Sequence, residues 1–156
     1  MPPCLYSELG GRYDHKLDPK NRIAIPSAWR PAEECPVILL AATDQGLPVL
    51  KGYSPECFRA YVDEVRERAS QMPDVTLKDI NSFVSRMYSE SMPTSINAQG
   101  KLLIPKQICE RLDLDGEILL AGCRDHFEIW KKELYHQAKE RALVALKHIN
   151  DQMGVF

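Results

Sequence analysis

The sequence has no excess of positive charge and no long apolar run. Its 20 Lys and Arg residues are outnumbered by 22 Asp and Glu residues, so the formal net charge is −2. Overall charge therefore gives no support for nucleic-acid binding, and any basic surface must be local. No stretch approaches the roughly 18 apolar residues of a membrane span, and the first residues lack the basic start of a secretory signal. We expect a cytoplasmic protein without membrane association.

Recognisable catalytic and metal-binding motifs are also lacking. The five cysteines, an odd number, show neither a CxxC pair nor a zinc-type Cys/His spacing. Cys57, Cys109 and Cys123 have apolar neighbours, so reduced and buried thiols are expected. There is no P-loop, Rossmann fingerprint or nucleophile elbow, and His126 is expected to be a surface histidine in a turn. We predict no enzyme activity, no catalytic residue, no cofactor and no metal site.

The sequence does contain one short unit twice. Residues 17–26 align with residues 96–105 as an apolar residue, Asp or Asn, two variable residues, Asn or Gly, a basic residue, three apolar residues and proline. Two further matches follow in the same order: residues 38–41 with 118–121, and residues 49–51 with 129–131. Because order and spacing both persist, chance similarity does not explain the match.

Each unit predicts the same succession of elements. A strand enters a turn, in which Asn21 or Gly100 can take a positive φ at low cost, and a second apolar strand stops at proline. Pro26 and Pro105 suit the start of a short helix. These helices are expected at Ser27–Glu34 and Lys106–Leu112. A third strand then follows, Val37–Ala42 in the first unit and Glu117–Gly122 in the second, and it is expected to be buried on both faces. A fourth strand ends at Leu50 in the first unit and at Trp130 in the second.

One unit of about 35 residues is too short to bury a stable core alone. The two units must therefore pack together, most simply as one barrel with a pseudo-twofold axis. The predicted fold class is α+β, with additional helices between and after the repeats. The expected divisions are a first repeat at 13–53, a helical insertion at 54–92, a second repeat at 93–131 and a C-terminal helix at 132–156.

Local signals place the helices outside the repeats. Ser54 followed by proline is a typical helix start, and Thr76 with Asp79 resembles a capping box. The first helix should end before Pro73. The apolar stripes of these helices are either internal packing or surfaces for a neighbouring subunit. They comprise Phe58, Tyr61, Val62 and Val65, then Ile80, Phe83, Val84 and Met87, and finally Leu134, Ala138, Ala142, Ala145, Leu146 and Ile149.

The two strand–turn–strand loops are the candidate functional sites. Lys20 and Arg22 alternate along a hairpin and should project together, and Lys101 holds the place of Arg22 in the second unit. Arginine can pair bidentately with guanine, and lysine is a good phosphate ligand. The loops either contact DNA or are solvated charged hairpins. Duplication favours DNA, because paired loops match the twofold symmetry of a duplex. Asp14 and Asp18 are expected to orient the turn or Arg22.

At these residues the chain resembles the MraZ family, whose members are tandem-repeat proteins of the AbrB-like, swapped-hairpin β-barrel superfamily. The matching pieces are Asp-Pro-Lys-Asn-Arg-Ile-Ala-Ile-Pro at 18–26, Gln-Gly-Lys-Leu-Leu-Ile-Pro at 99–105 and Phe-Glu-Ile-Trp at 127–130. The resemblance covers roughly residues 13–137. It implies a pseudo-twofold swapped-hairpin β-barrel built from two tandem AbrB-like ββαββ repeats.

The resemblance also implies a function. Such a protein would be a cytoplasmic, nucleoid-associated regulator that forms a ring-shaped homo-oligomer, an octamer or a dodecamer. It would bind repeated sites in the double-stranded promoter DNA of the operon for cell division and cell-wall synthesis. Competing interpretations are an AbrB-like antitoxin or other protein-interaction module, and an enzyme on a related double-psi barrel, for which no convincing nucleophile or acid pair is present.

The family's first-repeat loop motif is Asp-x-Lys-Gly-Arg, and both loops of this chain depart from it. Asn21 replaces the glycine, which leaves the turn possible. In the second repeat Asn97 replaces aspartate and Lys101 replaces arginine, so phosphate contact is expected there more than base contact. The expected DNA-binding residues are Lys16, Lys20, Arg22, Gln99 and Lys101. The expected turn-forming residues are Asp18, Asn21, Asn97 and Gly100.

Overall fold

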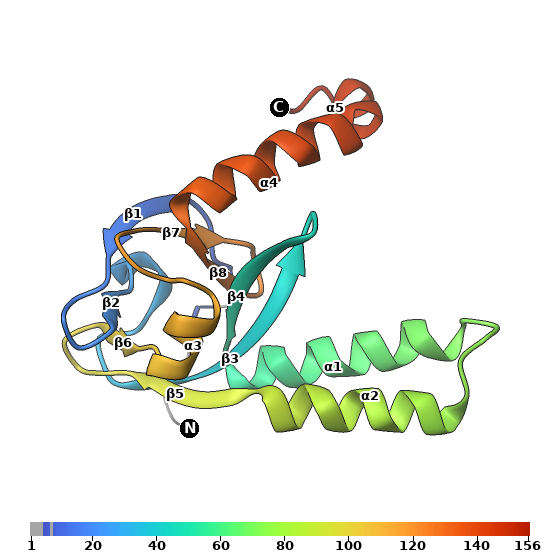
Figure 1. Cartoon of the computed structure of the whole chain (residues 1–156), viewed down its shortest axis with the longest axis horizontal. Helices are drawn as coiled ribbons and strands as arrows, with labels where there is room; N and C mark the ends of the chain where they lie inside the picture. Colours follow the sequence, from blue (N-terminus) through green and yellow to red (C-terminus); the bar gives the residue numbers. More distant parts are fainter. Residues whose placement is uncertain (1–4, 7) are drawn as a thin grey trace.

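The computed structural model describes residues 5, 6 and 8–156, which fold into a β-barrel with helices outside it (Figure 1). Eight strands form one antiparallel sheet in the order β1-β7-β8-β4-β3-β5-β6-β2. The edge strands β1 and β2 follow each other in the chain, and the sheet is a nearly closed barrel. The strands are β1 (Arg12–Lys16), β2 (Arg22–Ala24), β3 (Cys35–Asp44), β4 (Leu47–Tyr53), β5 (Met92–Ile96), β6 (Lys101–Leu103), β7 (Glu117–Gly122) and β8 (Phe127–Lys131). The helices are the 3-10 helix η1 (Ser27–Trp29), α1 (Pro55–Ser70), α2 (Leu77–Glu90), α3 (Lys106–Arg111), α4 (Lys132–Ala145) and α5 (Lys147–Met153).

Pairs of strands from the two halves of the chain alternate around the barrel. β1 pairs with β7, and β5 pairs with β3, so each half supplies a strand to the other. The β2–β6 pairing is symmetric between the halves. Arg22 corresponds to Lys101 and Ala24 to Leu103 in the duplicated unit, and Arg22 faces Leu103 while Lys101 faces Ala24. Both halves therefore build one sheet, and the predicted α+β class with a single barrel is confirmed.

The barrel is filled by large apolar side chains. Trp29 is buried between Tyr13, whose ring meets it edge-on at 5.3 Å between centroids, and Phe127, which stacks on it at 5.7 Å. The Trp29 indole N–H donates to the Gly10 carbonyl at 2.8 Å, so its polar atom is not left unpaired. Burial of one such side chain contributes roughly 1.5–3 kcal/mol to stability.

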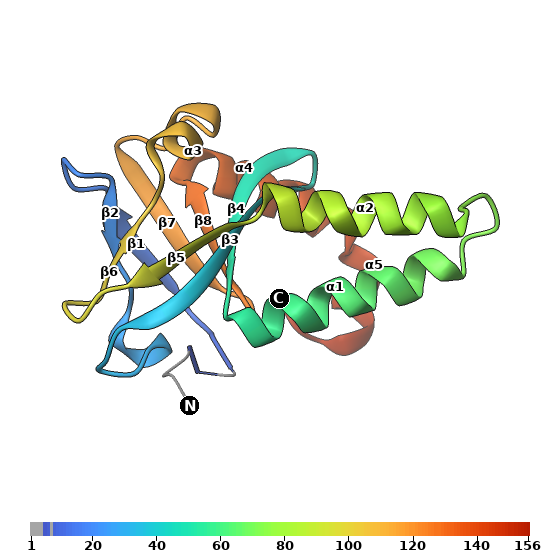
Figure 2. The same cartoon turned by 90° about the horizontal axis from the view of Figure 1, so that it is seen from below.

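Between the repeats, α1 and α2 form an antiparallel pair that we call the helical arm (residues 55–90). It extends from the barrel on the side opposite the β1–β2 turn (Figures 1 and 2). The predicted caps are confirmed: the Ser54 hydroxyl accepts from the Cys57 amide at 3.2 Å, and Thr76 and Asp79 form a complete capping box. Phe58, Val62 and Met87 are buried near the base of the arm, and Ile80 is buried nearer its tip. Phe83, which lies between Ile80 and Met87 on α2, is 54% exposed.

Two helix predictions were wrong in extent. Only η1 forms within Ser27–Glu34, because Pro31 forces the preceding Arg30 out of the helical region, to φ −133° and ψ 150°. The C-terminal helix is interrupted at Leu146, whose φ is −105° and ψ is 9°.

That C-terminal segment contacts the barrel along α4 as far as Arg141, whose Nη1 atom donates to the Gln45 carbonyl at 2.7 Å in the turn between β3 and β4. Leu134, Tyr135 and Ala138 lie in a cluster with Trp130, whereas the helix then runs past the sheet (Figure 1). Ala145, Leu146 and Ile149, which were expected to face inward, are exposed for this reason. No helix in the described part of the chain combines the length and the apolar character needed to cross a membrane.

The third strands also differ from the prediction in one half. β7 is buried on both faces from Ile118 to Ala121, as expected. β3 begins earlier and ends later than predicted, and its burial alternates, with Val37 and Leu39 inside the barrel. Ile38 and Leu40 point instead toward the base of the helical arm, where they are half-buried.

Candidate nucleic-acid interface

Two turns of the same construction connect β1 to β2 and β5 to β6. We call them the first loop (residues 17–21) and the second loop (residues 97–100). In the first loop the Asp18 Oδ1 atom accepts hydrogen bonds from the backbone amides of Lys20 at 2.8 Å and Arg22 at 2.9 Å. The side chain therefore holds the turn closed, since it supplies the acceptor for two amides of the turn.

The second loop repeats this arrangement with an amide in place of the carboxylate. The Asn97 Oδ1 atom accepts from the backbone amides of Gln99 at 3.0 Å and Lys101 at 2.9 Å. Both loops end in a left-handed residue, Asn21 with φ 59° and Gly100 with φ 80°. Asparagine and glycine are the residues that tolerate this conformation best.

The loops lie at the same end of the barrel. Each loop accepts a backbone hydrogen bond from the residue that directly follows the opposite loop's second strand. The Ile25 amide donates to the Gly100 carbonyl at 2.9 Å, and the Ile104 amide donates to the Asn21 carbonyl at 2.9 Å. Figure 2 shows the two turns as separate projections on the side away from the helical arm. The positive-φ residue of one loop is thus fixed by the other repeat.

Arg22 is held back against its own loop, while Lys20 is exposed. The Arg22 Nε atom donates to Asp18 Oδ2 at 2.8 Å, and its side chain is 36% exposed. Hydrogen bonds from the Arg22 amide and guanidinium and from the Lys20 amide hold the pKa of Asp18 below its usual value. Asp18 therefore orients Arg22, as expected. Asp14 does not share that role, because it pairs with Lys132 at 3.4 Å.

The other candidates have different surroundings. Gln99 is exposed and Lys101 is half-buried. Lys16 is exposed but lies opposite Glu117 in the β1–β7 ladder, so an acid offsets part of its charge.

Sequence reasoning missed Arg30 as a cation at this surface. The Arg30 Nε atom donates to the Ile25 carbonyl at 3.0 Å, and its guanidinium lies against the second loop. A Cβ atom added to Gly100 would come within 2.2 Å of the Arg30 Nη2 atom. No local signal reveals this, because the contact depends on the pairing of β2 with β6.

His15 was noted only as part of a basic stretch, and the structure places it near the other repeat. Burial first, and then the positive charge of Lys101, lower the pKa of His15 below its usual value. The imidazole is therefore mainly neutral at pH 7. It adds hydrogen-bonding capacity but little charge.

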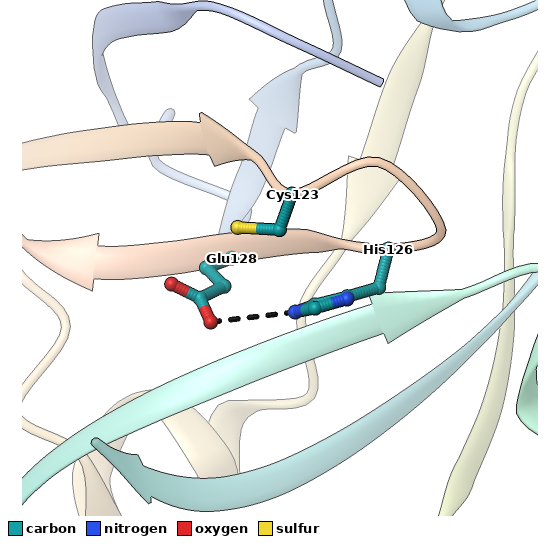
Figure 3. Close-up of side chains that lie close together, drawn as sticks. All are labelled: Cys123, His126 and Glu128. Carbon is teal, nitrogen blue, oxygen red and sulfur yellow. Dashed lines mark hydrogen bonds and ion pairs between the residues drawn. The ribbon is translucent and has the colours of Figure 1, made fainter. Parts of the chain in front are cut away.

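A second polar cluster lies at the turn between β7 and β8, where Cys123, His126 and Glu128 converge (Figure 3). The prediction of a surface histidine at position 126 was wrong: its side chain is 16% exposed and stacks on the Tyr53 ring at 5.1 Å between centroids. Donor atoms of the three residues lie within 4.8 Å of one another, so this cluster could hold a metal ion.

The cysteines largely match the expectation of buried thiols. Cys109 and Cys35 are buried, Cys57 and Cys123 are half-buried, and no disulfide joins the described cysteines. Cys4 lies outside the described residues.

Comparison with known proteins identifies the family. The sequence profile described as "MraZ protein, putative antitoxin-like" matches residues 87–153. The chain is 32% identical to the transcriptional regulator MraZ of Clostridium tetani, over 92% of this chain and 95% of the relative. It is 31% identical to that of Clostridium beijerinckii, over 83% and 86%, and 25% identical to that of Caldanaerobacter subterraneus, over 95% and 98%. The similarity covers most of this chain and of each relative, barrel and helices included. This chain therefore belongs to the MraZ family of transcriptional regulators.

Proposed function

We propose that this protein is a sequence-specific DNA-binding regulator that contacts duplex DNA through the first and second loops. The observation that carries the proposal is the pairing of two basic turns of identical hydrogen bonding at one end of the barrel. Each turn is held by a side chain of its own and by a strand of the other repeat. Rigid loops of this kind lose little conformational entropy on binding.

The two loops have unequal roles in this proposal. Asp18 holds the Nε atom of Arg22 and leaves the two terminal nitrogens available for a bidentate contact with guanine. Lys16 and Lys20, which are both exposed, would bind phosphates on the same side of the barrel as Arg22. Lys101 with Gln99 supplies phosphate and polar contacts from the second loop, because lysine lacks the fixed fork of arginine.

The architecture proposed for this role is the swapped-hairpin barrel. The exchange of strands between halves, β1 to β7 and β5 to β3, supports it. The proposed divisions are the repeats at 13–53 and 93–131, the helical insertion at 54–92 and the C-terminal segment at 132–156.

A ring of copies would reconcile DNA binding with the formal net charge of −2. We propose a cytoplasmic, nucleoid-associated homo-oligomer, an octamer or a dodecamer by family resemblance, that binds repeated promoter sites ahead of division and cell-wall genes. Several weak loop contacts would then act together, with a gain in avidity of about 10²-fold or more. Exposed apolar side chains of the helical arm, such as Met72, Leu77 and Phe83, are candidate subunit contacts.

The decisive experiment compares the DNA affinity of two variants that each remove one positive charge, one inside the proposed interface and one outside it. Fluorescence anisotropy titrations would use a duplex from upstream of the gene and the variants Arg22→Ala and Lys147→Ala. Lys147 lies on α5, is 73% exposed and pairs with Asp151 at 2.7 Å. We expect Arg22→Ala to weaken binding by about 10-fold or more and Lys147→Ala to leave it nearly unchanged.

Salt dependence and mass complete the test. Affinity should fall steeply with salt concentration if several phosphates are contacted, and Lys20→Ala should reduce that slope. Light scattering should give a discrete oligomer. Equal DNA affinity of the wild type, Arg22→Ala and Lys20→Ala would remove the first loop from the interface.

A second candidate function is an antitoxin-like module that binds a protein. The matching profile carries that description, and a groove on the helical arm is lined by Val65, Ala69, Met72, Val75 and Phe83. This alternative predicts a small oligomer that co-purifies with a toxin-like protein and binds DNA without preference for the upstream sequence.

A further inference from the structure

The turn between β7 and β8 gathers three side chains of metal-binding types. Cys123 follows β7, His126 precedes β8, and Glu128 lies within β8 (Figure 3). Among the residues that the structure describes, this is the group of three or more Cys, His, Asp or Glu side chains close enough to hold one ion. The corresponding positions of the first repeat, after the offset of 80 residues, are Thr43, Gly46 and Pro48, so the cluster is not inherited from the duplicated barrel.

The spacing of the donor atoms suits a tetrahedral ion. His126 Nε2 lies 3.4 Å from Glu128 Oε2, which is long for a hydrogen bond. It matches the roughly 3.3 Å edge of a tetrahedron whose ligands lie about 2.0 Å from zinc. The Cys123 Sγ atom lies within 4.8 Å of a ring nitrogen of His126 and of a carboxylate oxygen of Glu128. With a sulfur–zinc bond of about 2.3 Å, the tetrahedral edge from Sγ to a nitrogen or oxygen ligand is about 3.5 Å, and rotation of the half-buried Cys123 side chain can bring Sγ to that position.

Neighbouring groups already orient two of the three candidate ligands, His126 and Glu128. Asp125 Oδ1 lies 2.8 Å from His126 Nδ1, which directs the Nε2 atom toward Glu128 and Cys123. The Trp130 indole N–H donates to Glu128 Oε1 at 2.9 Å and leaves Oε2 for an ion. A carboxylate behind a ligating histidine and a donor behind a ligating carboxylate are the supports that metal ligands usually have. Stacking on Tyr53 fixes the ring plane.

Charge around the cluster is compatible with a divalent cation. Burial, and then the nearby Glu128 carboxylate, raise the pKa of Cys123 to about 12, so the thiol is neutral without a cation beside it. A bound ion would release that proton and make two anionic ligands, Cys123 and Glu128, which balance its charge. Lys51, which faces Glu128 across the β4–β8 ladder, adds one positive charge, and Asp125 adds one negative charge.

We propose that Cys123, His126 and Glu128 form a binding site for zinc or a similar borderline-soft divalent cation, with water at the fourth position. Thiolate and imidazole donors select zinc-like ions over magnesium or calcium, which prefer oxygen. The site lies beside Tyr53, at the junction of the barrel with the helical arm. The proposal is independent of DNA binding by the loops.

Cobalt(II) is the probe for this site because a cobalt–thiolate bond absorbs in the near ultraviolet and tetrahedral cobalt absorbs in the visible. The tag-free full-length chain, kept reduced, would be titrated with Co²⁺ and then with Zn²⁺. We expect saturation at one ion per chain and displacement of cobalt by zinc. Cys123→Ser should abolish the near-ultraviolet band, and Asp125→Asn, which removes only a supporting group, should weaken binding about 10-fold.

Cys57→Ser and His148→Ala are the matched controls, because they remove a thiol and an imidazole outside the cluster. Both should titrate like the wild type, and circular dichroism should show that every variant is folded. Two results would overturn the proposal: no cobalt–thiolate band in the wild type, or a band in Cys123→Ser equal to that of the wild type. Loss of the band in Cys57→Ser would place the site elsewhere and would overturn it as well.

Discussion

Gly52 in β4 lies directly opposite Phe127 in β8, and the Phe127 ring fills the space that a Cβ atom at Gly52 would need. Such an atom would be 2.3 Å from the Phe127 Cζ atom, far inside van der Waals contact. Phe127 cannot easily retreat, because it is fully buried and stacked on Trp29. The glycine is therefore required by packing between strands of the two repeats.

We predict that Gly52→Ala destabilises the protein by about 2–3 kcal/mol through overpacking. Urea unfolding followed by tryptophan fluorescence would measure the loss. Phe127→Leu in the same chain should recover part of it, since the shorter side chain frees the contested space. If Gly52→Ala proved as stable as the wild type, the close contact would be wrong.

The positive-φ residues of the two loops should differ in their tolerance to change. Gly100→Ala places a Cβ atom at φ 80° and against the Arg30 guanidinium, so we expect a loss of about 1–2 kcal/mol and displacement of Arg30. Asn21→Gly keeps the φ of 59° and adds no atoms, so its effect should stay within roughly 0.5 kcal/mol. Thermal unfolding of the two variants compares them directly. Equal losses would contradict this difference.

Asp18 tests whether loop geometry outweighs loop charge in DNA binding, and the prediction rests on the proposed function. Removing an acid near phosphates would strengthen binding if charge alone mattered. We predict instead that Asp18→Ala binds DNA more weakly, because the amides of Lys20 and Arg22 and the Arg22 guanidinium lose their acceptor. Asp18→Asn should bind better than Asp18→Ala, since Asn97 holds the second loop with an amide.

The control for that measurement is Asp151→Ala, the same charge change on α5, where the carboxylate pairs with Lys147 at 2.7 Å. It should leave DNA affinity within about twofold of the wild type. Tighter binding by Asp18→Ala than by this control would show that the carboxylate acts as a repulsive charge and not as a support for the loop.

The contribution of His126 to stability should depend on pH. Burial lowers the pKa of His126, but hydrogen bonds to Glu128 and Asp125 outweigh burial and leave the pKa above its usual value. A raised pKa means that the stabilisation is complete below about pH 6.5 and is lost as pH rises through the folded-state pKa. We predict that His126→Gln reduces the free energy of unfolding more at about pH 5.5 than at about pH 8.5.

Urea titrations at both pH values, with a chelator present to exclude metal binding, would measure this difference. The loss of stacking on Tyr53 does not depend on the charge of His126 in the same way and gives a constant offset. A difference between wild type and variant that was larger at the higher pH would reverse the assigned direction.

Features encoded by neighbouring residues were predictable. The Ser54 and Thr76–Asp79 caps follow from short motifs, and a single barrel built by both halves of the chain follows from a duplication that keeps its order and nearly its spacing. Other features depend on contacts between distant segments. Arg30 reaches the second loop only because β2 pairs with β6, and the burial of His126 depends on Tyr53 at the end of β4. The exposed end of the C-terminal segment was missed because periodicity does not show where the barrel stops.

The exchange of strands between halves has a consequence for how the chain folds. Residues 12–16 have their sheet neighbours at residues 117–121, so this contact closes a loop of about 100 residues and its formation is expected to be slow. The β3–β4 hairpin and the pairing of α1 with α2 join segments that are close in the chain, so these two units can form early. During synthesis the first strand must therefore wait for most of the chain to leave the ribosome, and until then its edge is open to pairing with other chains.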